Sequence, residues 1–110
     1  MKDSVEKNKK FNLLQSVNYV QGSIVSRQIM KNNSGNVTLF SLDEGQGLSE
    51  HTAPFDAQVH VLEGDLEIVI AGNRNVLTCA DAIIMEANKP HALKALTNVK
   101  FLLTMIKEQL

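Results

Sequence analysis

Apolar and polar residues alternate with a period of two through short runs along most of this chain. Leu66, Ile68 and Ile70, for example, share one face of such a run. Because successive side chains of a β-strand point to opposite faces, this period predicts strands. No segment shows the longer period of an amphipathic helix. Many short strands at a spacing of roughly 8–12 residues predict a sandwich or a barrel, so the fold class is all-β.

Turn residues separate these runs. Residues 32–36 read Asn-Asn-Ser-Gly-Asn, residues 63–65 read Glu-Gly-Asp, and residues 71–75 read Ala-Gly-Asn-Arg-Asn. Glycine and asparagine tolerate the positive φ that tight turns need, so we expect a turn at each place. Residues 87–90, which end in a proline, interrupt the pattern again, and the Gly- and Ser-containing stretch 44–50 is interpreted as a loop.

The apolar faces of the runs predict the interior of the barrel. Its expected members are Val59, Val61, Leu66, Ile68, Ile70, Ile84, Leu93, Phe101 and Leu103, and some of these are expected to face a partner instead. The single cysteine, Cys79, follows Val76 and Leu77, which favours a small buried side chain. One cysteine allows no intramolecular disulfide, and this suits the reducing cytoplasm, where we expect the protein to be.

Length and charge limit the classes of function. The chain has 110 residues, which is typical of one domain, and its net charge is −1. Such a small charge argues against binding to nucleic acid or to an anionic membrane. No apolar run reaches the length of about 18 residues that a membrane span needs. Residues 1–10 are charged with no apolar run behind them, so we expect a frayed terminus and not a secretory signal.

Three histidines are the candidates for chemistry. His51 and His91 each follow a loop and are expected to start a strand, at the end of a barrel where sites commonly form. His60 lies within a run that also contains Ala57, Val59 and Val61. Strand alternation places His60 on the face opposite those three residues, although a bulge would reverse this.

The spacing around these histidines resembles the two motifs of the cupin family. Gly45 is followed by five residues and then His51, and Gly64 closes the first motif. Residues 80–93 resemble the second motif throughout, and the spacer between the motifs has the length found in compact bacterial cupins of the cupin 2 or RmlC-like type. The resemblance covers residues 37–106. It implies a single-domain double-stranded β-helix, a jelly-roll barrel with a pocket at one end, and a homodimer.

Two departures from the motifs affect the residues that could bind a metal ion. Ala53 and Ala57 stand where the family has its second metal-binding histidine and its glutamate. Of the family's metal ligands, only His51 and His91 are therefore present in this sequence. The resemblance therefore implies either no metal or one divalent Fe, Mn, Ni or Zn ion with a third ligand from elsewhere. His60 is a disfavoured third candidate, and the directions of Glu50 and Glu86 are open.

Other departures concern the backbone. Ala80, Glu86 and Asn88 replace a glycine, a proline and a second glycine of the second motif. Asparagine tolerates the left-handed conformation that glycine would supply, so the change at position 88 is expected to be mild.

Three hypotheses for function remain. The first is a module that binds a small organic molecule, such as a carboxylate or a sugar derivative, with pocket residues His51, Ala53, Ala57, Val59 and His91. The second is a metal-dependent oxygenase, isomerase or decarboxylase that uses His51, His91 and an unassigned third ligand. The third is a regulatory or structural dimer without turnover. The missing ligands favour the first.

Overall fold

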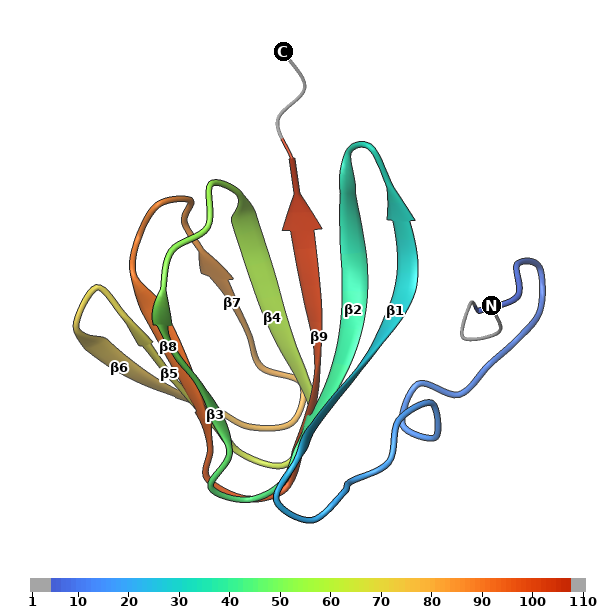
Figure 1. The fold of residues 1–110 in the computed structure, drawn as a ribbon, viewed down its shortest axis with the longest axis horizontal. Helices are drawn as coiled ribbons and strands as arrows, with labels where there is room; N and C mark the ends of the chain where they lie inside the picture. The colour runs from blue at the N-terminus through green and yellow to red at the C-terminus, as the bar shows by residue number, and fades with distance from the viewer. Residues whose placement is uncertain (1–4, 108–110) are drawn as a thin grey trace.

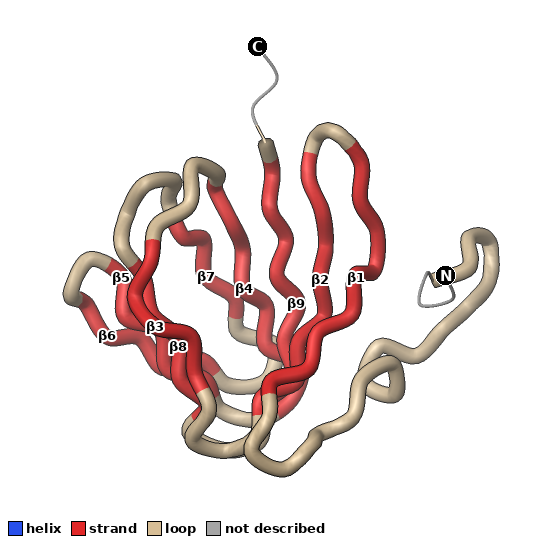
Figure 2. The backbone as a smooth tube through the Cα atoms, in the orientation of Figure 1, coloured by secondary structure: helices blue, strands red, loops and turns tan. Residues whose placement is uncertain are grey.

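The computed structural model describes residues 5–107, which form two antiparallel sheets (Figures 1 and 2). The described strands are β1 (Ile24–Asn32), β2 (Gly35–Leu42), β3 (Gly47–His51), β4 (Asp56–Glu63), β5 (Leu66–Ile70), β6 (Asn73–Leu77), β7 (Ala82–Met85), β8 (His91–Ala95) and β9 (Val99–Ile106). One sheet has the order β1-β2-β9-β4-β7 and the other β3-β8-β5-β6. This is the double-stranded β-helix that the sequence predicted. None of the described residues forms a helix long and apolar enough to cross a membrane.

The turn signals lie between the strands as predicted. Residues 33–34 join β1 to β2, residues 64–65 join β4 to β5, and residues 71–72 join β5 to β6. Gly64 has a φ of 86°, and a Cβ at this position would overlap the carbonyl oxygen of Asn98. Ala80 and Asn88, which stand at the two glycine positions of the second motif, have φ values of 75° and 67°. The expectation that Asn88 adopts a left-handed conformation is therefore confirmed.

The core fills the space between the two sheets. Val59, Val61, Leu66, Ile68 and Phe101 are all fully buried there, as the alternation predicted. The prediction for Ile84 was wrong: Ile84 is 68% exposed because its neighbours Ile83 and Met85 take the inward positions of β7.

The expectation for Cys79 was also wrong. Cys79 is exposed, because it lies in the turn between β6 and β7 and not in a strand. Its thiol donates to the carbonyl oxygen of Leu62 at 3.2 Å.

The segment before β1 lies along the outer face of the five-stranded sheet. Three side chains of this face donate to its backbone: Lys100 to the carbonyl of Leu14, Arg27 to that of Ser16 at 3.3 Å, and Ser41 to that of Asn18 at 2.9 Å. We call residues 12–20 the strap. Residues 5–11, which we call the arm, form a loop without helix or strand. The remainder of the expected frayed terminus, residues 1–4, lies outside the described residues.

Candidate functional site

A β-bulge places His51 at the site. In the pairing of β3 with β8, Leu48 lies opposite Leu93, but His51 lies opposite His91, so the register shifts by one residue between them. Leu48 packs against the core. Because His51 follows Leu48 by three residues, regular strand alternation would turn its side chain away from the interior. The bulge therefore brings His51 onto the same face as His91.

The position of His51 corrects part of the sequence analysis. Residues 47–50 belong to strand β3 where the sequence predicted a loop, and His51 ends this strand instead of starting one. His91 does begin β8, as expected. Pairing with β8 supplies hydrogen bonds that the local sequence of residues 47–51 does not reveal, which explains the difference.

The two imidazole rings contact each other. Their Nε2 atoms are 3.1 Å apart, and the ring centroids are 4.3 Å apart at an interplanar angle of 68°. His91 is 6% exposed, whereas His51 is exposed. The pair therefore has one member within the barrel and one at its edge, at the end where the two sheets diverge in Figure 1.

Backbone carbonyls determine which nitrogens carry hydrogen. Nδ1 of His51 lies 2.8 Å from the carbonyl oxygen of Ser49, and Nδ1 of His91 lies 3.1 Å from that of Lys89. A carbonyl oxygen can only accept, so each Nδ1 must donate. In the neutral rings, both Nε2 atoms then carry lone pairs that converge on one place. Such an arrangement is stabilised by a shared proton, by the hydrogen-bond donor of a ligand, or by a cation.

The inward-facing residues around the pair are apolar or uncharged. Ile70 lies opposite His91 in the register and Asn73 lies opposite Ile70. On the other sheet, Ala57 lies between Met85 and Met105. The regular inward-facing positions of the described strands hold no aspartate or glutamate. The imidazoles are thus the ionisable side chains at the inward-facing positions of this end of the barrel.

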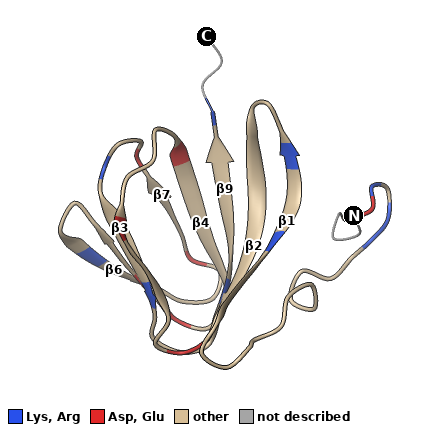
Figure 3. Ribbon diagram, viewed as in Figure 1, with Lys and Arg blue, Asp and Glu red and all other residues tan. Residues whose placement is uncertain are grey.

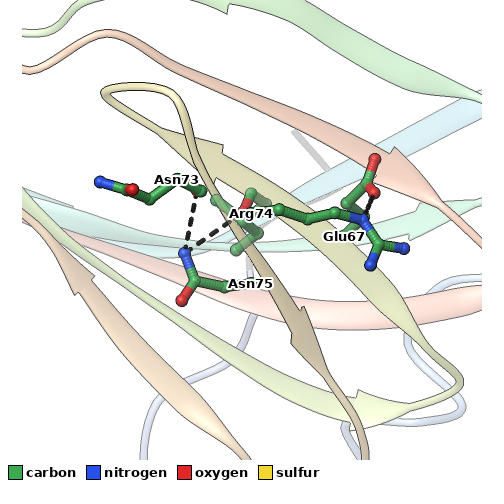
Figure 4. A network of polar contacts seen from close by, with 5 residues as sticks. Glu67, Asn73, Arg74 and Asn75 are labelled. Carbon is green, nitrogen blue, oxygen red and sulfur yellow. Dashed lines mark hydrogen bonds and ion pairs between the residues drawn. The ribbon is translucent and has the colours of Figure 1, made fainter.

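The edge of the smaller sheet supplies amides to this end. Figure 4 shows Arg74 of β6 paired with Glu67 of β5, on the outer face of the sheet. Asn73 and Asn75 alternate with Arg74 and so face inward. The side-chain amide of Asn75 donates to the carbonyls of Ile68 at 3.4 Å and Asn73 at 3.3 Å, which holds it against the strand.

The other predicted site residues lie at different depths. Ala57 is the first inward residue of β4, while Val59, one layer below, is fully buried. Ala53 lies in the loop between β3 and β4, where its carbonyl accepts from the backbone N–H of Asn88 at 2.7 Å. Sequence reasoning did not place Asn73 at this end of the barrel, although period-two counting from Ile70 across the hairpin would have put it on the inward face.

The third histidine lies apart from the pair. His60 alternates with the core residues Val59 and Val61, so it is on the outer face of the five-stranded sheet. Among residues 5–107, no group of three or more His, Cys, Asp or Glu side chains is placed to hold a metal ion. The described side chains therefore provide two imidazole ligands at the site and no third ligand.

Similarity to solved structures extends over nearly the whole chain. A Streptococcus pyogenes protein of unknown function is 34% identical, with 96% of this chain and 93% of that chain covered and a TM-score of 0.90. An RmlC-like cupin protein from Desulfovibrio desulfuricans is 25% identical, with 89% and 95% covered and a TM-score of 0.78. A cupin 2 conserved barrel domain protein from Leptotrichia buccalis is 34% identical, with 88% and 47% covered and a TM-score of 0.85. No family model and no curated protein matches the sequence.

Proposed function

Because this chain belongs to the cupin superfamily, whose barrel is a scaffold for many chemistries, we propose a function from the site itself. The chain binds a small, mainly apolar molecule at the end of the barrel that holds His51 and His91. The polar head of this molecule carries an acidic or hydroxyl O–H group. The observation that carries this proposal is the 3.1 Å approach of the two Nε2 atoms, while both Nδ1 atoms lie against backbone carbonyl oxygens.

The chemistry of the surroundings supports such a ligand. Both Nδ1 atoms are occupied by carbonyl acceptors, so the Nε2 atoms are the free polar atoms of the pair. An O–H group placed between them would replace a repulsive contact of lone pairs with a hydrogen bond. The apolar side chains Ile70, Met85 and Met105 would contact the body of the ligand, and methionine adapts to varied shapes.

A metal is the second candidate because the same geometry fits two metal ligands. With metal–nitrogen bonds of about 2.0–2.1 Å, nitrogens at this separation would subtend about 100° at the ion. Enzymatic zinc and non-haem iron sites take three protein ligands, however, and the described residues offer two. The residues fit an ion only in part, so we derive no metal-dependent reaction.

Thermal melting with a panel of probes tests the proposal. The probes are hexanoate, benzoate, hexanol and benzyl alcohol, with wild-type protein purified without a histidine tag. A probe at ten times its Kd stabilises the fold by about 1.4 kcal/mol. This would raise the Tm by about 5 to 10 °C in a domain of this size. The His91→Ala variant is expected to show no rise.

His60→Ala is the matched control, because it removes an imidazole from the outer face and should keep the full rise. Equal rises in His91→Ala and wild type would contradict the proposal. Elemental analysis of the same samples addresses the metal. About one Fe, Mn, Ni or Zn ion per chain, lost in the His51→Ala, His91→Ala double variant, would favour the second candidate. The cytoplasmic location and the absence of nucleic-acid or membrane binding stay predictions.

A further inference from the structure

Strand β1 is the longest edge strand of the described fold. It has nine residues, whereas the edge strands β3, β6 and β7 have five, five and four. Along an edge strand, alternate backbone N–H and C=O groups point away from the sheet, where a further strand can pair with them. A bulge between Gln28 and Met30 divides this edge, so that residues 24–28 form its longer regular part. These five residues are a template for one more strand.

A groove adjoins this edge. Its volume is about 1280 Å³, and residues of the arm, the strap and β1 line it. Figure 1 shows the arm standing away from β1. The strap is held to the sheet by hydrogen bonds from Lys100, Arg27 and Ser41, so the groove has a fixed base. A strand that paired with β1 would therefore lie in this groove, with the arm as its opposite wall.

The lining of the groove is basic. Its basic residues are Lys7, Lys9, Arg27 and Lys31. The acidic residue of the lining, Glu6, forms an ion pair with Lys9 at 3.5 Å. Figure 3 shows basic residues on both walls, the arm and β1. The chain as a whole has a net charge of −1, so the positive charge of the groove is a local feature that favours an acidic occupant.

The same lining contains exposed apolar side chains. Phe11 on the arm, Val20 at the end of the strap and Met30 on β1 are all exposed. Apolar surface of this kind gains free energy when a partner covers it. The groove therefore matches a chain that carries both carboxylates and apolar side chains.

We propose that β1 binds an extended acidic segment of another protein, which joins the five-stranded sheet as a further strand in this groove. Backbone hydrogen bonds to β1 provide affinity for an extended chain, and the lining selects its side chains. Carboxylates of the segment meet the basic residues, and its apolar side chains contact Phe11, Val20 and Met30. The groove does not include His51 or His91, so this inference is independent of the proposed ligand site.

The charge of β1 argues against a second copy as the occupant. Strand β1 carries Arg27 and Lys31 and no acidic residue. A symmetric pairing of β1 with β1 would bring the basic residues of both copies together, and like charges at an interface cost free energy. Pairing of β1 with β7 of a second copy would be head-to-tail, and such contacts continue into rings or filaments. An acidic segment of a different protein meets neither obstacle.

Fluorescence anisotropy of the full chain with labelled peptides tests the proposal. The probe is fluorescein-Gly-Val-Glu-Val-Glu-Val-Glu-Val-amide. We expect saturable binding that weakens at least tenfold between about 50 and 500 mM NaCl, because salt screens the charges. Lysine in place of each glutamate should weaken binding at least tenfold. Proline in place of the two inner valines should do the same, because proline keeps the charge but lacks the N–H that a sheet requires. No binding of the probe, or equal binding of the proline peptide, would overturn the proposal.

The Met30→Glu variant tests where the peptide binds. Met30 is 65% exposed on β1, so the substitution should leave the fold intact while it places a negative charge in the groove. We expect at least tenfold weaker binding, and the same for Lys31→Glu. Ile84→Glu is the matched control, because Ile84 is 68% exposed on β7, the opposite edge of the same sheet. It should bind as the wild type does, and circular dichroism verifies that each variant is folded. Equal weakening by Ile84→Glu and Met30→Glu would contradict a site at β1.

Hydrogen exchange locates the added strand. With the glutamate peptide bound, backbone amides within residues 24–28 should exchange at least tenfold more slowly, while those of β7 keep their rates. Protection that appears around His51 and His91 instead would assign the peptide to the barrel end and overturn the proposal. Protection of residues 24–28 that rises with protein concentration in the absence of peptide would identify a second copy as the occupant, and it would overturn the proposal as well.

Discussion

At the scale of single residues, Tyr19 links the strap to the sheet beneath it. Its hydroxyl donates to a carboxylate oxygen of Glu63 at 2.6 Å, and the ammonium of Lys100 lies 5.0 Å from its ring centroid. Burial, reinforced by the hydrogen bond to Glu63 and its negative charge, raises the pKa of Tyr19 well above its usual value of about 10. The phenol therefore stays protonated in the folded protein at pH values where it would ionise in the unfolded chain.

This shift predicts a loss of stability at alkaline pH. The folded pKa is the higher one, so the contribution is complete below about pH 10 and is lost as pH rises toward the folded pKa. Tyr19→Phe should cost about 1–2 kcal/mol at pH 7.5. Between pH 7.5 and pH 11, the wild type should lose about 1 kcal/mol more than the variant. Urea unfolding at both pH values measures this, and parallel losses would refute the assignment.

Two further residues show what motif matching can and cannot predict. Asn88 and Ala80 both occupy left-handed backbone at glycine positions of the motif. Asparagine tolerates the left-handed conformation, so the conformation of Asn88 could be predicted from its residue type. Alanine tolerates it poorly, so the sequence alone did not indicate that Ala80 adopts the same conformation. The turn itself imposes it, because Asp81 accepts hydrogen bonds from the backbone N–H and hydroxyl of Thr78.

At the scale of elements, the β4–β5 turn depends on a close approach of two backbone segments. Gly64 combines a φ of 86° with a backbone contact to Asn98, whereas Gly72 in the β5–β6 turn has a φ of 84° and open space around it. A comparison of the two positions therefore separates the free-energy cost of the left-handed backbone from the cost of overlap between a side chain and the neighbouring backbone.

The comparison yields a prediction for two alanine variants. Gly72→Ala should lower the free energy of unfolding by about 1 kcal/mol, the cost of a left-handed alanine. Gly64→Ala should lower it by about 3 kcal/mol or more, because the Asn98 segment must also move. Chemical denaturation of both variants measures the difference. Equal losses would mean that the turn adjusts freely.

Element prediction succeeded where the sequence carries its own signal. The hairpin at residues 71–72 and the inward faces of β4 and β5 followed from turn residues and alternation. Strand β3 did not, because its order comes from pairing with β8, which lies more than 40 residues later in the chain. The bulge that orients His51 likewise depends on the pairing of two strands, so it could not be predicted from the local sequence of β3.

At the scale of the whole molecule, the homodimer that the family resemblance implies would make stability depend on protein concentration. If unfolding and dissociation are coupled, a rise from 5 to 500 µM protein should raise the Tm by about 5 °C. The Ile84→Glu variant places a charge on the exposed outer face of β7, and it should show no such rise if that face is the contact between the two copies. Scanning calorimetry at both concentrations measures this. A wild-type Tm that does not change with concentration would contradict coupled dissociation.

The global fold was predicted because spacing, turns and strand pattern all agreed. Ile84 was assigned to the interior, since period-two counting identifies two faces of a strand but not which one meets the core. That decision depends on the register of β7 against β4, where Ala57 lies opposite Met85. The proposed pocket rests on such long-range placements, and the homodimer implied by the resemblance stays a prediction.

The register shift in β3 has a consequence for how this protein could change over generations. His51 follows the inward-facing Leu48 by three residues, and the extra residue of the bulge lets both share one face. Deleting one residue at positions 49–50 would place the histidine two residues after Leu48, where regular alternation alone points it toward His91. A relative one codon shorter in β3 would therefore keep the imidazole contact, and an alignment without a gap at the bulge would pair its histidine with the wrong residue.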